Sequence, residues 1–219
     1  MMATLELRLN RHIDLLLSRY PVLEPIREEL IDAYLLMQES YQQGGKLLVA
    51  GNGGSAADAE HIVGELMKRF KLPRPVSPEL AEKLAAIDPD RGAELAQSLE
   101  MGLTAISLPA HEASITAFIN DVGSADVYAQ QLLGYARPGD VFLAISTSGN
   151  SENMLRAIVL AKALGVKVIG LTGITGGKMG PMCDVAVHAP ETETYMIQEF
   201  HLPIYHCWCL MLEDFFFGK

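Results

Sequence analysis

A hydroxyl-rich segment follows one of the most apolar runs of the sequence. Residues 146–151 read Ser-Thr-Ser-Gly-Asn-Ser, with four hydroxyls in six residues, directly after Val141–Ile145. A phosphate monoester needs several hydrogen-bond donors, and hydroxyls and the amides that open a helix can supply them without a lysine. A polar, capped turn could have the same composition. Four hydroxyls at the carboxyl end of a buried strand nevertheless favour a phosphate site.

A glycine-rich segment follows a second apolar run, Lys46–Ala50. It reads Gly-Asn-Gly-Gly-Ser over residues 51–55. Glycines let the backbone turn tightly and let a ligand approach the amides, and Ser55 is expected to cap the next helix at its anion-favouring end. A plain strand-to-helix turn is the alternative. The spacing matches neither a Walker loop nor the dinucleotide-binding GxGxxG pattern.

Candidate acid–base groups occur on two expected helices. His61 and Glu65 are four residues apart and therefore share a helix face. Gln198 and His206, eight residues apart, lie near one stripe of the last helix, roughly 80° offset. Such groups could exchange protons with a substrate or hold a divalent metal. Alternatively, His61 and Glu65 form a solvated pair, and His201 or His206 is a core histidine.

Five short apolar runs predict the strands that must position these groups. The runs are continuous rather than alternating, and helical patterns separate them. This order is typical of a parallel sheet covered on both faces, whose ligands bind beyond the carboxyl ends of the strands. The expected strands are Lys46–Ala50, Gly102–Leu108, Val141–Ile145, Lys167–Leu171 and Asp184–His188. The expected helices are Leu5–Ser18, Ile26–Gln43, Ala56–Phe70, His111–Ile119, Ser124–Tyr135, Glu152–Leu164 and Thr194–Phe217. Pro203 lies inside the last helix, so a kink or a late start is expected there.

Composition and charge limit the class of protein. The 219 residues carry a formal net charge of −10, which argues against a nucleic-acid binder that neutralises phosphates. The apolar stretch 202–217 is too short and too polar to span a bilayer, and the N-terminus has no secretory pattern. Three cysteines (Cys183, Cys207 and Cys209) form no disulfide framework, and the last two are expected to fill the core. A cytoplasmic protein without nucleic-acid or membrane partners is expected.

Several ordered motifs resemble the sugar isomerase (SIS) domain family, and within it the bacterial phosphoheptose isomerases. The motifs are GNGGSAADAEH, HIVGELMKRF, ISTSGNS, LTGITGGKM and IQEFHLPIYH, from about Lys46 to His206. The resemblance implies a flavodoxin-like, three-layer α/β fold with a five-stranded parallel sheet and helices on both faces. It also implies a single domain over residues 1–219, with N-terminal helices in 1–45, assembled as a homotetramer with active sites between subunits.

The resemblance also assigns roles to individual residues. It implies that Ser146, Thr147, Ser148 and Ser151 hold the phosphate of a phosphorylated sugar. It places Asn52, Gly53, Gly54, Ser55, Asn120, Asp121 and Gln198 around the sugar, with Arg69 near the substrate. Members of the family that bind zinc do so through the positions of His61, Glu65, Gln198 and His206, so one zinc per subunit is expected.

The implied reaction is the isomerisation of sedoheptulose 7-phosphate to glycero-manno-heptose 7-phosphate, a step of carbohydrate metabolism that can supply heptose for lipopolysaccharide. Such a reaction needs a base beside the carbonyl and an acid–base group that moves protons between two oxygens. Glu65 suits the first role and His206 the second. Two alternatives stay open: a non-catalytic adaptor of the replication-initiation type, and a sensor that binds a sugar phosphate unchanged. The adaptor relatives lack the glutamate and the histidine, and this sequence has both.

The sequence departs from the family pattern at two places. Residues 76–101 form a longer segment than usual, in which Pro78 and Pro89 are each suited to the first turn of a short helix. This insertion is either a surface hairpin or a lid or intersubunit contact. Tyr195 stands where the family often has an aspartate three residues before Gln198, so the substrate could differ from the standard heptulose.

Overall fold

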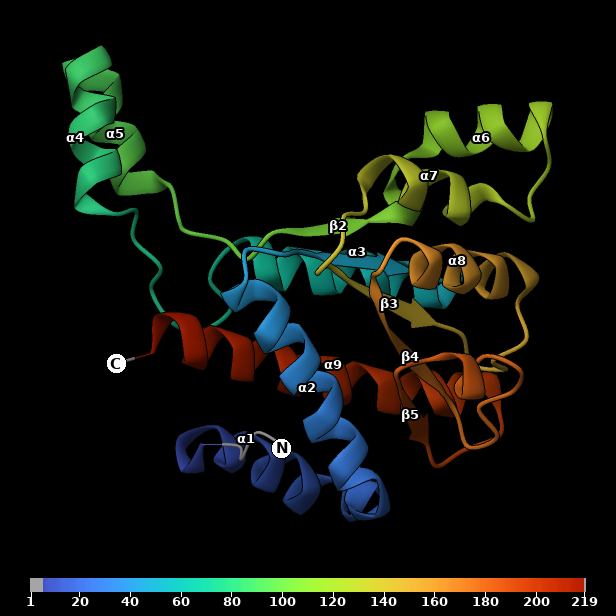
Figure 1. Ribbon diagram of the computed structural model, residues 1–219. Coiled ribbons are helices and arrows are strands. Elements are labelled where there is room, and N and C mark those ends of the chain that lie inside the picture. The colour runs from blue at the N-terminus through green and yellow to red at the C-terminus, as the bar shows by residue number, and fades with distance from the viewer. Residues whose placement is uncertain (1–5, 219) are drawn as a thin grey trace.

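The computed structural model describes residues 6–218 and contains one parallel sheet (Figure 1). The strand order is β2-β1-β3-β4-β5, and every neighbouring pair is parallel. The predicted five-stranded parallel sheet is therefore confirmed. The strands are β1 (Leu47–Ala50), β2 (Ala105–Ser107), β3 (Val141–Ile145), β4 (Lys167–Gly173) and β5 (Val185–Ala189).

Helices cover both faces of the sheet, as the continuous apolar strands predict. Side chains of β1 alternate between two cores: Leu47 and Val49 belong to one, Leu48 and Ala50 to the other. The first core packs against α1, α2, α3 and α9, and the second against α7 and α8. The three layers of the predicted α/β sandwich result from this alternation.

The helices agree with the expected order and differ mostly at their ends. The predicted helix starting at Leu5 has its first residue outside the described part of the chain. The α-helices are α1 (Leu7–Arg19), α2 (Arg27–Gln42), α3 (Gly54–Met67), α4 (Pro78–Ile87), α5 (Pro89–Ser98), α6 (Glu112–Asp121), α7 (Val127–Tyr135), α8 (Glu152–Ala163) and α9 (Thr194–Phe217). Short 3₁₀ segments are η1 (Pro21–Ile26), η2 (Leu108–Ala110) and η3 (Gly180–Met182). Among residues 6–218, no helix combines the length and apolar character needed to cross a membrane.

The last helix, α9, runs through the first core. It begins at Thr194, so Pro203 does not delay its start. The indole of Trp208 donates to the carbonyl of Leu30 at 3.0 Å, which ties α9 to α2. Cys207 and Cys209 are buried on the same helix, as expected for core residues. Figure 1 shows α3 and α9 on the same side of the sheet.

The insertion forms a helical hairpin of α4 and α5 that projects away from the sheet (Figure 1). Both prolines occupy the first turn of their helices, as predicted. Ser77 caps α4 by accepting from the amide of Leu80, and Asp88 caps α5 in the same way. No residue of α4 is buried, so the hairpin adds little to either core. The choice between a surface hairpin and a lid or subunit contact stays open.

Candidate active site

A cavity of about 270 Å³ opens at the carboxyl ends of β1 and β3. Both loops that the sequence singles out border it, together with the start of α9. It lies where ligands bind in open parallel sheets. The lining residues are Asn52, Gly53, Gly54, Ser55, Ile145, Ser146, Thr147, Ser151, Thr194 and Gln198.

The cavity combines hydroxyl groups with three helix N-termini. Helices α3, α8 and α9 all begin at its edge, and Ser151 is the N-cap residue of α8. The hydroxyls of Ser146 and Ser151 lie 3.1 Å apart. None of the lining side chains is charged. Because helix N-termini carry unsatisfied amides and a partial positive charge, the cavity suits an oxyanion such as phosphate without a cationic side chain.

The glycine-rich loop fits closely against α9. Gly53 has a φ of 57° and is the N-cap residue of α3, so the prediction that Ser55 caps this helix is wrong. Helix α3 begins earlier than expected because glycine tolerates this left-handed backbone, and the Ser55 side chain is buried within the first turn. A Cβ on Gly54 would lie 2.5 Å from Nε2 of Gln198. The small residue therefore lets the Gln198 amide reach the cavity edge.

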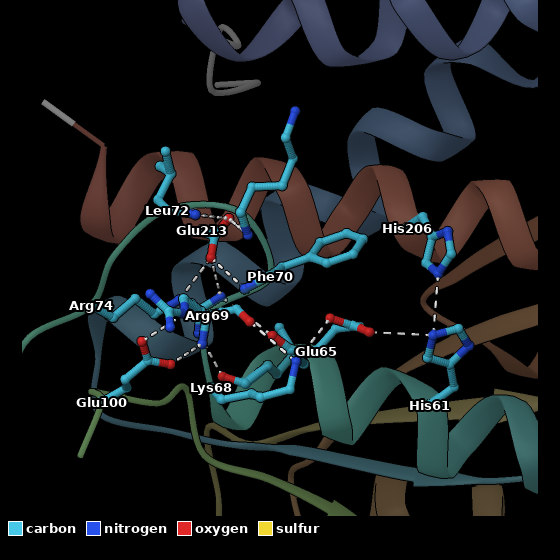
Figure 2. Close-up of polar contacts among 12 residues, drawn as sticks. His61, Glu65, Lys68, Arg69, Phe70, Leu72, Arg74, Glu100, His206 and Glu213 are labelled. Atoms are coloured by element: carbon cyan, nitrogen blue, oxygen red, sulfur yellow. Dashed lines mark hydrogen bonds and ion pairs between the residues drawn. The ribbon is translucent and has the colours of Figure 1, made fainter. Parts of the chain in front are cut away.

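A second group of polar side chains lies further along α3 and α9 (Figure 2). Nε2 of His61 lies 3.3 Å from Oε1 of Glu65 and 3.4 Å from Nε2 of His206. We call His61, Glu65 and His206 the acid–base cluster. The Glu65 side chain is only 15% exposed, and burial together with His61 lowers the pKa of His206. A neutral imidazole beside a shielded carboxylate can exchange protons with a substrate.

The cavity and the acid–base cluster share the same two helices. Gln198 at the cavity and His206 in the cluster are both on α9, which separates them by roughly 12 Å along the helix axis. On α3, Glu65 lies eleven residues beyond Gly54, or roughly 16 Å along the helix axis. The two sites therefore lie about two to three turns apart in one chain. A ligand held by both must be extended, with its anionic end at the cavity.

Comparisons with known proteins show the family of this chain. Two SIS-domain family profiles match the chain, over residues 102–212 and 17–92. The phosphoheptose isomerase of Aneurinibacillus thermoaerophilus is 40% identical over 82% of this chain and 77% of its own length. That of Helicobacter pylori strain P12 is 38% identical over 90% of this chain and 89% of its own. The chain belongs to the phosphoheptose isomerase family of SIS-domain proteins.

Solved structures of phosphoheptose isomerases have the same fold. The enzyme from Neisseria gonorrhoeae matches with a TM-score of 0.72 at 30% identity, covering 96% of this chain and 100% of the other. The enzyme from Francisella tularensis matches with a TM-score of 0.74 at 29% identity, covering 94% and 97%. These likenesses confirm the SIS fold predicted from the motifs.

The structure places some of the predicted phosphoheptose isomerase residues away from the cavity. Ser148 is exposed and lines a neighbouring hollow with Thr147. Asn120 and Asp121 are exposed at the end of α6, where the Asn120 amide donates to Asp121 at 2.9 Å. Arg69 follows α3 and pairs with Glu100 at 3.0 Å. Their assignment to the substrate stays a prediction.

Several residues near the two sites are absent from the sequence-based prediction. Thr194 lines the cavity at the start of α9, and its position before a long apolar helix is the signal that could have found it. Asp58 comes between Gly54 and His61 on α3, and Tyr205 on α9 contacts both Asp58 and His61. Asp58 is three residues before His61, and Tyr205 is one residue before His206. This closeness in sequence to two predicted site residues is the signal that could have indicated them.

The acid–base cluster contains side chains of the types that bind zinc, but their arrangement matches a zinc site only in part. Ligand atoms about 2.0–2.1 Å from one tetrahedral zinc lie roughly 3.3 Å apart, close to the two spacings that His61 makes with Glu65 and His206. Across residues 6–218, however, no three His, Cys, Asp or Glu side chains are arranged to hold a metal together. The predicted fourth ligand, Gln198, lies beside Gly54 at the cavity.

Replacing Thr147 by valine tests the cavity as an anion site. Valine has nearly the same shape but lacks the hydroxyl that borders the cavity. A hydrogen bond to a charged group contributes about 1.5–3 kcal/mol, so the affinity for inorganic phosphate should fall by roughly 10- to 100-fold. Isothermal titration with phosphate measures this change.

The matched control is Thr116→Val on α6. The Thr116 hydroxyl bonds to the carbonyls of its own helix, at Glu112 and Ala113. This variant should bind phosphate with the affinity of the unaltered protein. Equal affinities for both variants would show that the Thr147 hydroxyl does not contact the anion.

Proposed function

We propose that this isomerase converts sedoheptulose 7-phosphate to D-glycero-D-manno-heptose 7-phosphate through an enediol intermediate. The observation that carries the proposal is the acid–base cluster located about three turns along the helices whose N-termini border the cavity. The phosphate and the carbonyl are at opposite ends of such a substrate. One chain therefore offers a separate site for each end, at a fixed spacing.

The cavity binds the phosphate and so sets the position of the sugar. Hydroxyls of Ser146, Thr147 and Ser151 and the amides that open α3, α8 and α9 are the donors. Side chains of Asn52 and Asn153 exchange two hydrogen bonds of 3.0 Å, which fixes the glycine-rich loop against α8. Such a rigid site holds the reactive carbons near the cluster at little entropic cost during the reaction.

Glu65 acts as the base on carbon. Its carboxylate takes the proton from carbon 1, beside the carbonyl of carbon 2, and the electron pair left behind forms the enediolate. The same carboxylic acid then returns the proton to carbon 2, which gives the aldose. The partial burial of Glu65 keeps this proton from exchanging freely with water.

His206 moves the second proton. It gives a proton to the oxygen on carbon 2 as the enediol forms and accepts one from the oxygen on carbon 1 as the carbonyl re-forms there. Burial lowers the pKa of His206, so the ring is neutral near pH 7 and can both donate and accept. Atoms and charges then balance over the whole isomerisation.

An assay with purified protein and sedoheptulose 7-phosphate tests the proposal. Nuclear magnetic resonance should show the aldose product growing as the ketose signal falls. Binding of the ketose without any change would favour the sensor, and neither binding nor turnover would favour the adaptor. Either result would overturn the proposed reaction.

We also propose zinc as the cofactor, held by His61, Glu65 and His206. The support is the donor set and the two spacings that His61 makes; a third contact would need a side chain of the cluster to rotate. When bound, a zinc ion would stabilise negative charge on the enediolate oxygens. Gln198 would join the ligands only if it left the cavity edge.

Metal removal tests the cofactor. After exhaustive dialysis against a chelator, turnover should fall at least about tenfold, because no metal ion would then stabilise the negative charge of the transition state. Added zinc should restore turnover. Elemental analysis before and after dialysis reports zinc per chain independently of activity. Full turnover by protein shown to hold no zinc would contradict this cofactor.

We further propose that the chain assembles as a homotetramer, with Arg69, Asn120 and Asp121 contributing to the site of a neighbouring subunit. The support is their exposure in a single chain, away from the cavity. In such an assembly the projecting hairpin of α4 and α5 would be available for contacts between subunits.

A further inference from the structure

A chain of three polar side chains connects α3 and α9 beside the acid–base cluster. The Tyr205 hydroxyl lies 3.2 Å from Oδ1 of Asp58 and 3.0 Å from Nδ1 of His61. Tyr205 is fully buried, with 1% of its surface exposed. Its neighbours therefore determine what its single hydroxyl proton can do.

Asp58 is a stronger hydrogen-bond acceptor for the Tyr205 proton than His61 is. A carboxylate can only accept, and hydrogen bonds to a charged acceptor are about twice as strong as those between neutral groups. The other carboxylate oxygen, Oδ2, is buried and has no hydrogen-bond partner within the described chain. In the part of the chain that the structure describes, Tyr205 is thus the donor to the Asp58 side chain, through Oδ1. A tyrosine hydroxyl has an ordinary pKa of about 10 and so keeps its proton at neutral pH.

The orientation of this hydroxyl determines the tautomer of His61. Since the Tyr205 proton points to Asp58, the oxygen of Tyr205 can only accept from His61. Nδ1 of His61 must then carry the ring proton, which leaves a lone pair on Nε2. Oε1 of Glu65 lies 3.3 Å from that nitrogen, without the alignment of a hydrogen bond. His206, at 3.4 Å, must therefore donate to it through Nε2–H.

We propose that Tyr205 and Asp58 are positioning residues that hold His61 in the Nδ1-protonated form, with its Nε2 lone pair facing Glu65 and His206. This inference rests on the proposed function for its consequence in catalysis. In this form His61 keeps the N–H of His206 pointed into the cluster and can also serve as a ligand to a cation. In the opposite tautomer, Nε2–H of His61 would donate to Glu65, and this hydrogen bond would make the carboxylate less available as a base.

A second buried histidine provides an internal reference. Nε2 of His201 lies 3.2 Å from the carbonyl of Thr172, which can only accept, so His201 is protonated on Nε2. Burial lowers the pKa of His201 to about 4, so the ring is neutral. The ring proton of His201 therefore should sit on the opposite nitrogen from that of His61.

Nitrogen-15 NMR of histidine-labelled, metal-free protein at about pH 8 measures both tautomers directly. In the unaltered protein, the unprotonated nitrogen should be Nε2 in His61 and Nδ1 in His201. Tyr205→Phe removes the acceptor for Nδ1–H, and the proton should move to Nε2, toward Glu65. Asp58→Leu should shift His61 the same way, because it removes the acceptor of the tyrosine proton. In both variants His201 should be unchanged.

Tyr41→Phe is the matched control. It also deletes one tyrosine hydroxyl, which donates to the carbonyl of Thr104 and not to any residue of the acid–base cluster. This variant should leave the His61 tautomer unchanged. A His61 ring protonated on Nε2 in the unaltered protein would overturn the proposal. So would a tautomer that neither Tyr205→Phe nor Asp58→Leu alters.

Turnover provides the second measurement. Groups that orient a functional histidine typically contribute 10- to 100-fold, so Tyr205→Phe should lower kcat by at least about tenfold with little change in KM. The NMR result does not depend on turnover. A protein with the expected tautomers but no isomerase activity would refute the proposed function and leave the positioning of His61 intact.

Discussion

Replacing Glu65 by glutamine should lower kcat for isomerisation by about 100-fold or more and leave the thermal midpoint nearly unchanged. The amide has almost the shape of the carboxylate but cannot accept a proton from carbon. General-base catalysis typically contributes 10²- to 10⁴-fold, which sets the expected loss. A steady-state assay and a thermal melt on the same preparation measure the two quantities.

Glu60→Gln is the matched control for this change. Glu60 is on the same helix, α3, and is exposed. Both variants lose one negative charge, so a general charge effect would appear in both. Turnover by Glu65→Gln within about twofold of the unaltered protein would show that another group removes the carbon-bound proton.

The fold can be predicted from the sequence because the strands are short, apolar and bounded by turn residues. Val141–Ile145 is predicted with the correct ends, since Gly139 and Asp140 precede it and the hydroxyl-rich loop follows. The loops after β1 and β3 are also located correctly. Parallel strands bring their carboxyl ends to one edge, so loops far apart in sequence can be expected to share a cavity.

Element ends depend on partners that no local pattern shows. The helix expected to reach Phe70 ends at Met67, because the amides of Phe70 and Lys71 turn to the carboxylate of Glu213 on α9. The strand expected from Gly102 starts at Ala105. The amide of Leu103 donates instead to the carbonyl of Leu66, at the end of α3.

The site itself is predictable only residue by residue. Spacing places His61 beside Glu65, and the structure brings His206 to the same point. Spacing does not show that Gln198 stays at the cavity or that Tyr205 bonds to His61. These relations depend on how α3 packs against α9, which is a property of the whole core.

The Glu213 carboxylate at the end of α3 also forms a buried ion pair with Arg74. Each side chain is at most 1% exposed, and the shortest distance between the charged groups is 2.9 Å. The Glu213 carboxylate also accepts amide protons from Phe70, Lys71 and Leu72. The guanidinium donates to the carbonyls of Leu66 and Glu65, so this pair holds the backbone of the proposed base (Figure 2).

Glu213→Gln should therefore destabilise the protein by about 3–5 kcal/mol, because it leaves a buried guanidinium without its counter-charge. For a chain of this size the thermal midpoint should fall by roughly 6–20 °C, as calorimetry would show. Glu100→Gln is the control. It breaks the pair with Arg69, whose side chain is 61% exposed, and should cost less than about 1 kcal/mol.

The double variant Arg74→Met with Glu213→Leu separates charge burial from loss of packing. Removing both charges leaves no uncompensated ion, so this variant should be more stable than Glu213→Gln despite losing more hydrogen bonds. The amides of residues 70–72 would lose their acceptor, which should loosen the segment after α3 and lower turnover through Glu65. A double variant less stable than Glu213→Gln would mean that the carboxylate stabilises the fold mainly through those amides rather than through Arg74.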